Sequence, residues 1–203
     1  MISGVVSLRG HLIELQPLEW NHVPALMVIA RGAPTAFALT STPRTEEEAN
    51  AYFGEAMRLQ SAGTTRAFVL RKRGTQEIVG TTRLYDIDLR NRRCSIGFTW
   101  LDPAVHGDGS NTEAKYLLLR LAFNEWAMNR VQFQVDERNG RSQAALRRLG
   151  AQEEGRLRLH MLASDGSYRT TIVFSILAPD WPSVRTQLEQ RLLLGLAGSS
   201  RRS

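Results

Sequence analysis

The sequence has a single cysteine, Cys94, so it can form neither an intramolecular disulfide bond nor a cluster of thiolate metal ligands. No apolar run approaches the roughly 18 to 20 residues that cross a bilayer. The first residues also lack the basic and apolar regions of a signal peptide. We therefore expect a cytoplasmic protein in which Cys94 is a structural thiol.

Lysine is scarce, since Lys72 and Lys115 are the only two, yet the chain has a formal charge of +6 that comes from its arginines. These arginines are spread along the sequence and do not form the basic cluster of a nucleic-acid-binding protein. Most aromatic residues fall at core-facing positions of the predicted elements, where they cannot stack on bases. The composition therefore disfavours nucleic-acid binding and is compatible with a small polyanionic ligand.

A chain of 203 residues fits one compact domain, which we expect to span 1–197, with a flexible tail over 198–203. Residue alternation predicts strands near 5–15, 66–70, 78–85, 95–101, 131–136, 156–162 and 170–177. Helical periodicity and capping residues predict helices near 21–30, 46–63, 112–128, 140–149 and 181–194. This order predicts an α+β fold in which a central, mostly antiparallel sheet is flanked by helices. A ligand is expected at the carboxyl ends of the central strands, where the helix 112–128 begins.

A glycine-rich loop stands between a predicted strand and the start of that helix. Its residues are His106, Gly107, Asp108, Gly109, Ser110 and Asn111. Unpaired backbone amides at a helix start, together with the helix dipole, make such a loop an anion site, with Asp108 expected to point into solvent. The same pattern is also common in turns that bind nothing.

A second polar pair, Asn139 and Ser142, stands at the start of the helix near 140–149. Asn139 is the expected N-cap, and Ser142 falls on the same face as Ala145, Leu146 and Leu149. This spacing predicts a hydroxyl group that is turned inward at a helix start. The alternative is a serine whose hydroxyl bonds its own backbone.

The segment 96–155 resembles the GNAT family of acetyltransferases, and within it the RimJ/RimL-like branch. The resemblance rests on the residues at 97–103, 107–115, 136–139 and 149–151. It implies a single-domain GNAT fold and acetyl-coenzyme A as co-substrate. Two residues depart from the usual loop, which starts with Arg or Gln where this chain has His106 and has Gly or Ala where this chain has Asn111.

The resemblance also assigns roles to residues at both motifs. The pyrophosphate of coenzyme A would bind the loop that contains His106, Gly107, Gly109, Ser110, Asn111 and Thr112. Thr99, Trp100 and Leu101 would line the pantetheine through their backbone, and Asn139 would hydrogen-bond it. Ser142 would lie near the sulfur as the candidate general acid. The thioester would enter where the strand 98–101 separates from the strand 131–136.

The general base is the least defined role. His160 is a candidate because it falls on the face of its strand opposite Leu157, Leu159 and Met161. Asp86 and Glu137 are rivals, and a water relay or a purely structural His160 is also open. The four histidines, His11, His22, His106 and His160, show no metal-ligand spacing, so we expect no metal.

The predicted function is direct transfer of an acetyl group to a primary amine, with the N-terminal α-amino group of a ribosomal or other protein as the favoured acceptor. The alternatives are acetylation of a small-molecule amine and a GNAT-like module that binds coenzyme A without catalysis. A homodimer is plausible. The loops 32–43 and 86–93 should shape the acceptor side, but they contain no readable code for the acceptor.

Overall fold

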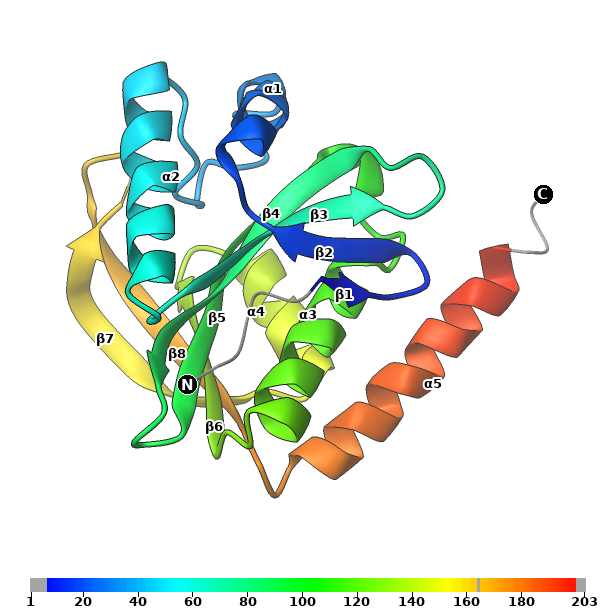
Figure 1. Cartoon of the computed structure of the whole chain (residues 1–203). Coiled ribbons are helices and arrows are strands. Elements are labelled where there is room, and N and C mark those ends of the chain that lie inside the picture. The colour runs from blue at the N-terminus through cyan, green and yellow to red at the C-terminus, as the bar shows by residue number, and fades with distance from the viewer. Residues whose placement is uncertain (1–6, 164, 200–203) are drawn as a thin grey trace.

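The computed structural model describes residues 7–163 and 165–199, which form one mixed sheet flanked by helices (Figure 1). Within those ranges the sheet has eight strands in the order β1-β2-β3-β4-β5-β6-β8-β7. The strands are β1 (Leu8–Arg9), β2 (Ile13–Pro17), β3 (Arg66–Lys72), β4 (Ile78–Asp88), β5 (Arg93–Leu101), β6 (Arg130–Asp136), β7 (Gln152–Leu162) and β8 (Tyr168–Leu177). Every described pair is antiparallel except β5 with β6. The predicted α+β class is confirmed.

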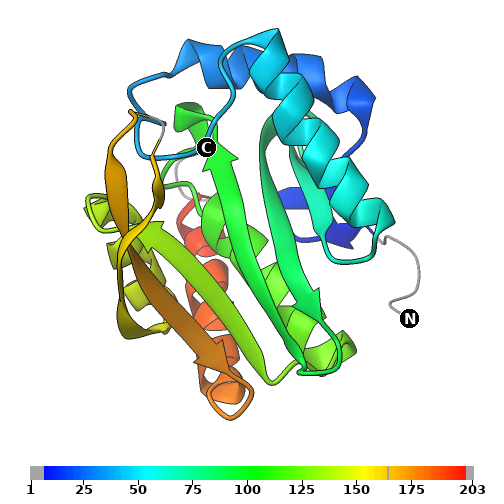
Figure 2. The same cartoon turned by 90° about the vertical axis from the view of Figure 1, so that its left-hand side faces the viewer.

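Helices cover both faces of the sheet (Figures 1 and 2). They are α1 (Val23–Gly32), α2 (Glu46–Ser61), α3 (Ser110–Arg120), α4 (Gly140–Leu149) and α5 (Trp181–Ser199), with short 3-10 turns at Trp20–His22 and Pro103–Val105. The first two pack on one face around Phe53 and Trp100, whereas the core under the other three contains Leu118 and Leu146. No helix within the described ranges is long and apolar enough to cross a membrane.

Several boundaries agree with the sequence patterns. Thr45 caps α2, and its hydroxyl and the Glu48 side chain form a reciprocal capping box. Asn139 caps α4, which ends at Gly150 in the left-handed region with a φ of 94°. These three predictions are confirmed because each cap acts through its own local backbone.

Other boundaries were predicted wrongly. The helix expected over 112–128 begins two residues earlier and changes at Leu121 to a π-helical turn, Leu121–Glu125. α5 continues to Ser199, so the tail expected from 198 begins inside a helix, since glycine costs a helix only about 1 kcal/mol. The rest of that tail, 200–203, and the first residues of the expected strand over 5–15 lie outside the described residues.

The strands β5 and β6 pair over a short stretch only. Their parallel pairing joins Arg93–Ser95 to Arg130–Gln132, and no pairing between them follows in the described sheet. Figure 2 shows the two strands diverging beyond that point. Phe98 of β5 lies in the separated stretch with a left-handed φ of 52°, a conformation that is unusual for a bulky residue. α3 and α4 begin beyond the separated ends of β5 and β6.

A buried carboxylate fixes the start of α3 against the turn between β1 and β2. Glu113 is 2 % exposed and accepts hydrogen bonds from the backbone N–H groups of His11 (2.7 Å), Leu12 (2.8 Å) and Ile13 (2.9 Å). A Cβ atom at Gly10 would lie 2.3 Å from the Glu113 carboxyl carbon, so only glycine fits there. The β1–β2 turn, at the edge of the sheet, therefore holds the first turns of α3 in place.

Replacing Glu113 by glutamine should destabilise the fold, because an amide NH2 would then face backbone N–H donors. A hydrogen bond to a charged group contributes about 1.5–3 kcal/mol, so we expect a loss of about 1–3 kcal/mol. The melting temperature should fall by about 2–4 °C for each kcal/mol. Glu125→Gln, an exposed change in the adjoining π-helical turn, is the control. Equal melting temperatures for the two variants would contradict the anchoring role of Glu113.

Candidate active site

A cavity of about 580 Å³ lies at the separated ends of β5 and β6. It is lined by ten residues to which the family resemblance gave a coenzyme role, namely Thr99, Trp100, Leu101, His106, Gly107, Gly109, Asn111, Thr112, Asn139 and Ser142. Its other walls come from the α1–α2 loop, including Phe37, and from α5. Two predicted residues, Ser110 and His160, do not line this cavity. Residues far apart in the sequence therefore meet in one cavity.

The glycine loop presents backbone donors at this cavity. Gly107 and Gly109 adopt left-handed φ values of 86° and 98°, which turn the chain sharply before α3. The backbone N–H groups of Gly107, Gly109, Asn111 and Thr112 have no hydrogen-bond partner within the described residues. Because they stand at the positive end of the α3 dipole, they form a site suited to a phosphate group.

Asp108 is exposed and does not line the cavity, as the sequence had suggested, but its carboxylate is held by two partners. Its Oδ1 accepts from the Ser110 backbone N–H (2.8 Å), and its Oδ2 lies 3.0 Å from the Lys72 ammonium. Burial alone would raise the pKa of Asp108, but the Ser110 N–H and the Lys72 charge outweigh it and lower the pKa. Asp108 therefore shapes the loop from behind, and the Ser110 N–H is not one of the free donors.

Ser110 itself lies under the loop and does not reach the cavity wall. It is fully buried, and its hydroxyl oxygen has no hydrogen-bond partner among the described residues. Adjacent residues of a first helical turn point in different directions, so only one of Ser110 and Asn111 can face the cavity. Their positions in the sequence do not say which one it is.

His106 bridges the two sides of the cavity. Its Nε2 lies 3.1 Å from the Leu101 carbonyl oxygen, and its Nδ1 lies 3.1 Å from a guanidinium nitrogen of Arg141 in α4. A carbonyl can only accept and a guanidinium can only donate, so this arrangement requires a neutral ring with the proton on Nε2. His106 thus holds Arg141 at the start of the glycine loop. This is the position at which the resembled family usually has Arg or Gln.

The Ser142 hydroxyl is available to a ligand. The Ser142 backbone N–H donates to the Asn139 Oδ1 (3.0 Å), as expected for an N-cap, but the Ser142 hydroxyl makes no hydrogen bond within the described residues. This side chain is half-buried and lines the cavity. A serine occupied by its own backbone is therefore not what the structure shows.

Several cations of the cavity were missed by the sequence reasoning. Lys115 of α3 donates to the Asn111 Oδ1 (2.8 Å), and burial lowers the pKa of its ammonium to about 8. Arg148 of α4 and Arg191 of α5 lie on the same cavity wall. The spacing of four between Asn111 and Lys115 could have indicated that pair. No sequence signal placed α5 near the loop, because only the tertiary packing of Trp181 and Leu188 does so.

His160 is an exposed residue of β7 and does not line the cavity. Its Nδ1 is 3.0 Å from the Thr171 hydroxyl, which also accepts from the Arg169 Nε (2.9 Å). The strict alternation expected around it is interrupted, because the pairing register shifts between Leu157 and Met161. The structure thus connects His160 with β8 and does not place it against the predicted coenzyme residues.

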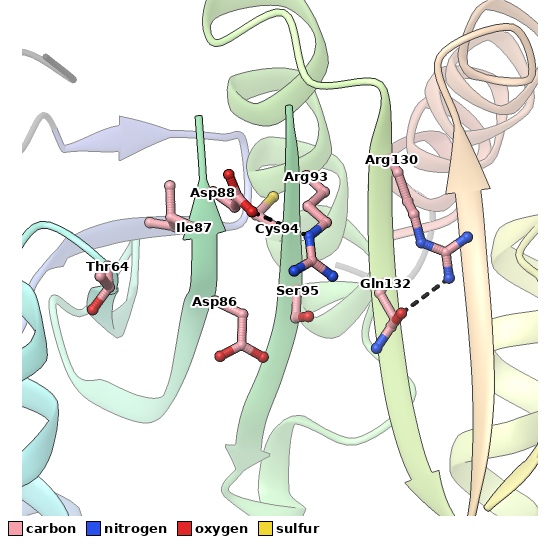
Figure 3. A pocket seen from close by; sticks show the side chains of 9 residues that line it. All are labelled: Thr64, Asp86, Ile87, Asp88, Arg93, Cys94, Ser95, Arg130 and Gln132. Carbon is pink, nitrogen blue, oxygen red and sulfur yellow. Dashed lines mark hydrogen bonds and ion pairs between the residues drawn. The ribbon is translucent and has the colours of Figure 1, made fainter. Parts of the chain in front are cut away.

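Neither of the two rival bases lines this cavity. Asp86 lines a second cavity of about 440 Å³ at the paired ends of β5 and β6, beside Ser95 and across from Gln132 (Figure 3). The Glu137 carboxylate forms an ion pair with Arg156 and is exposed. No group of three or more potential metal-ligating side chains occurs within the described residues.

Comparison with known proteins identifies the family. The family model described as "Acetyltransferase (GNAT) domain" matches residues 13–152. A protein described as "Putative ribosomal N-acetyltransferase YdaF", from Bacillus subtilis, is 32% identical over 104 residues, which are 51% of this chain and 56% of the relative. The matched part therefore spans little more than half of that relative. An uncharacterised N-acetyltransferase named p20, from Bacillus licheniformis, is 30% identical over 61% of this chain and 68% of its own length.

Solved structures agree with the family model. The crystal structure of a protein described as a putative acetyltransferase from T. thermophilus has a TM-score of 0.82 at 35% identity and covers 95% of this chain and 100% of its own. Mycobacterium smegmatis RimJ, in complex with CoA-disulfide, has a TM-score of 0.78 at 21% identity, with 92% and 93% covered, and at this identity shows the fold alone. With a family model that matches more than half of its length, the chain belongs to the GNAT family of N-acetyltransferases.

Proposed function

We propose that this protein transfers an acetyl group from acetyl-coenzyme A directly to a primary amine, and that the amine is the N-terminal α-amino group of a protein. The observation that carries the proposal is the row of partnerless amides at 107, 109, 111 and 112, which opens into the same cavity as the unbonded Ser142 hydroxyl. One end of this cavity suits a diphosphate, and the other contains a proton donor.

The cavity walls fit coenzyme A in charge and shape. The pyrophosphate would bind the four loop amides, with Arg141, Lys115 and Arg191 as counter-charges. The backbone of β5 from Thr99 to Leu101, which has no strand partner on its β6 side in the described sheet, would line the pantetheine arm. The Asn139 side-chain NH2, which has no partner among the described residues, is a donor for the same arm.

Direct transfer requires little from the protein beyond position and one proton. Acetyl-coenzyme A would supply a thioester that a neutral amine can attack. The Ser142 hydroxyl would give its proton to the departing sulfur, and backbone N–H groups near Trp100 and Leu101 would stabilise the oxyanion. Cys94 takes no part, because it is buried and burial raises the pKa of its thiol to about 12.

The choice of an α-amino acceptor rests on proton chemistry and on the relatives. An α-amino group has a reference pKa of about 7.7–8.0, against about 10.4 for lysine, so much more of it is neutral near pH 7.5. No carboxylate lines the coenzyme cavity in the described structure, and both ring nitrogens of its one histidine, His106, are engaged by Leu101 and Arg141, so no free general base is at hand there. A relative that carries the name of a ribosomal N-acetyltransferase supports a ribosomal or other protein N-terminus.

Acetyl-coenzyme A should raise the melting temperature, and Gly109→Ala should abolish most of that rise. Alanine at a φ of 98° is strained, and its Cβ atom would lie 3.0 Å from Leu12. Ligand at a hundredfold excess over its dissociation constant stabilises by about 2.7 kcal/mol. Gly63→Ala, at a φ of 79° and remote from the cavity, carries a similar backbone strain and should keep the full rise. Failure of millimolar acetyl-coenzyme A to shift the wild-type protein would refute the proposed co-substrate.

Ser142→Ala should lower kcat by about a hundredfold or more, because the departing thiolate loses its proton donor. Coenzyme binding, followed by the thermal shift, should change little. Ser183→Ala is a matched control. Ser183 is the third residue of α5, just as Ser142 is the third residue of α4, but Ser183 is exposed and does not line the cavity. Undiminished turnover in Ser142→Ala would return Ser142 to a structural role.

A peptide with a free N-terminus should be acetylated in preference to its N-blocked, lysine-containing twin. If His160 assists the deprotonation, His160→Ala should reduce the rate mainly below the pKa of the acceptor amine and matter less at alkaline pH, where the amine deprotonates unaided. Mass spectrometry of both peptides over a range of pH measures this. Preference for the blocked lysine peptide would reject the α-amino acceptor, and activity on small amines alone would keep the transferase and reject its protein substrate.

A further inference from the structure

The face of the sheet that carries α2 contains an arginine that the proposed chemistry does not use. Arg83 of β4 is only 3 % exposed, and its guanidinium carbon lies 4.2 Å from the centre of the Tyr52 ring and 4.4 Å from that of Phe98. Its register partner on β5 is Gly97, the residue before the left-handed Phe98. Arg83 therefore lies beside the point where β5 separates from β6, on the side opposite α3.

The hydrogen bonds of this guanidinium are largely unmade. A guanidinium has five N–H donors, whereas Arg83 donates from Nη2 to the Tyr52 carbonyl oxygen (3.1 Å) and has one further side-chain interaction, with the Tyr52 hydroxyl. Its Nε is buried with no partner. Burial lowers the pKa of Arg83, although the nearby Tyr52 and Glu55 oppose this effect. A buried charge without a counter-ion is costly, and stacking on two rings returns only part of that cost.

The chain does not supply a carboxylate to Arg83. The Glu55 side chain is occupied by Arg58, which donates to both of its oxygens at 2.7 Å. On β8, which lies beyond β6 in the sheet, Arg169 is half-buried, its Nε donates to Thr171, and it forms no ion pair within the described residues. Its charge acts on Tyr85, whose ring lies 5.0 Å from that of Phe98. Neither guanidinium group forms an ion pair in the described structure, although the charge of Glu55 acts on Arg83 and that of Asp136 acts on Arg169.

We propose that Arg83 binds a carboxylate of the acceptor, so that the preferred substrate is a primary amine with an acidic group close to it, such as a protein N-terminus with Asp or Glu among its first residues. This inference rests on the proposed acetyl transfer and names the class of its acceptor. The carboxylate would reach the guanidinium from the side of Phe98, a residue that is 40 % exposed. A bidentate contact to Nε and Nη1 would satisfy the donors that the protein leaves free.

The test compares acceptors that differ only in charge. One series consists of C-terminally amidated peptides with a free N-terminus and with Asp or its isostere Asn at position one, two or three. A second series consists of short neutral peptides with a free or an amidated C-terminus, which separates a side-chain carboxylate from a terminal one. A hydrogen bond to a charged group contributes about 1.5–3 kcal/mol, so kcat/KM should favour the acid over the amide by about ten- to a hundredfold in at least one matched pair.

Arg83→Met should reduce that ratio of kcat/KM toward one. An apolar residue of similar length can replace a buried charge without loss of stability, and the thermal shift with acetyl-coenzyme A reports whether the variant is folded. Arg66→Met is the matched control on β3 and should keep the preference, because within the described residues the Arg66 guanidinium bonds only the carbonyl oxygens of Gln60 and Thr65.

Comparison of ratios within each variant keeps the test valid when the variant is merely less active. Equal use of acidic and amide acceptors by the wild type would overturn the inference alone, as would an undiminished acid preference in folded Arg83→Met. Absence of transfer to every acceptor would overturn the proposed acetyl transfer and, with it, this inference.

Discussion

The early separation of β5 from β6 is the constraint on which the proposed site depends. Two parallel strands that pair only at Arg93–Ser95 and Arg130–Gln132 leave the rest of their facing backbone without a ladder. Backbone polar groups inside a protein need partners, so such a gap in the middle of a sheet favours a ligand that can itself hydrogen-bond like a strand. The amide-containing pantetheine arm of coenzyme A has that property, and the cavity lies where the gap opens.

Two supports fix the glycine loop and the start of α3 beside this gap. Glu113 ties the start of α3 to the β1–β2 turn, and Asp108 shapes the glycine loop from behind through Ser110 and Lys72. The loop amides are consequently arranged before any ligand binds, which lowers the cost of binding. On the opposite face, Arg83 stands beside the same gap. The coenzyme and the amine would therefore approach one opening from two sides of the sheet.

The sequence predicted those features that depend on neighbours along the chain. The caps at Thr45 and Asn139, the stop at Gly150 and the glycine loop are local, and each was found where its residues suggested. Contacts between distant segments could not be predicted. No periodic pattern in the sequence indicates three of these contacts. They are the burial of Glu113 against 11–13, the position of Arg191 of α5 at the cavity, and the position of Arg83 between Tyr52 and Phe98. Asp108 is exposed as expected, but its partner Lys72 could not be predicted for the same reason, since it is 36 residues away.

Single-turnover transfer with labelled acetyl-coenzyme A tests the central claim most directly. The protein would be mixed, in excess over the label, with a peptide that has a free N-terminus, and the label would be followed by intact-mass analysis of protein and peptide. The account predicts one free thiol for each acetylated α-amine and no acetyl group on the protein at any time. An acetyl group that first accumulates on the protein, or thiol release without an acetylated amine, would contradict it.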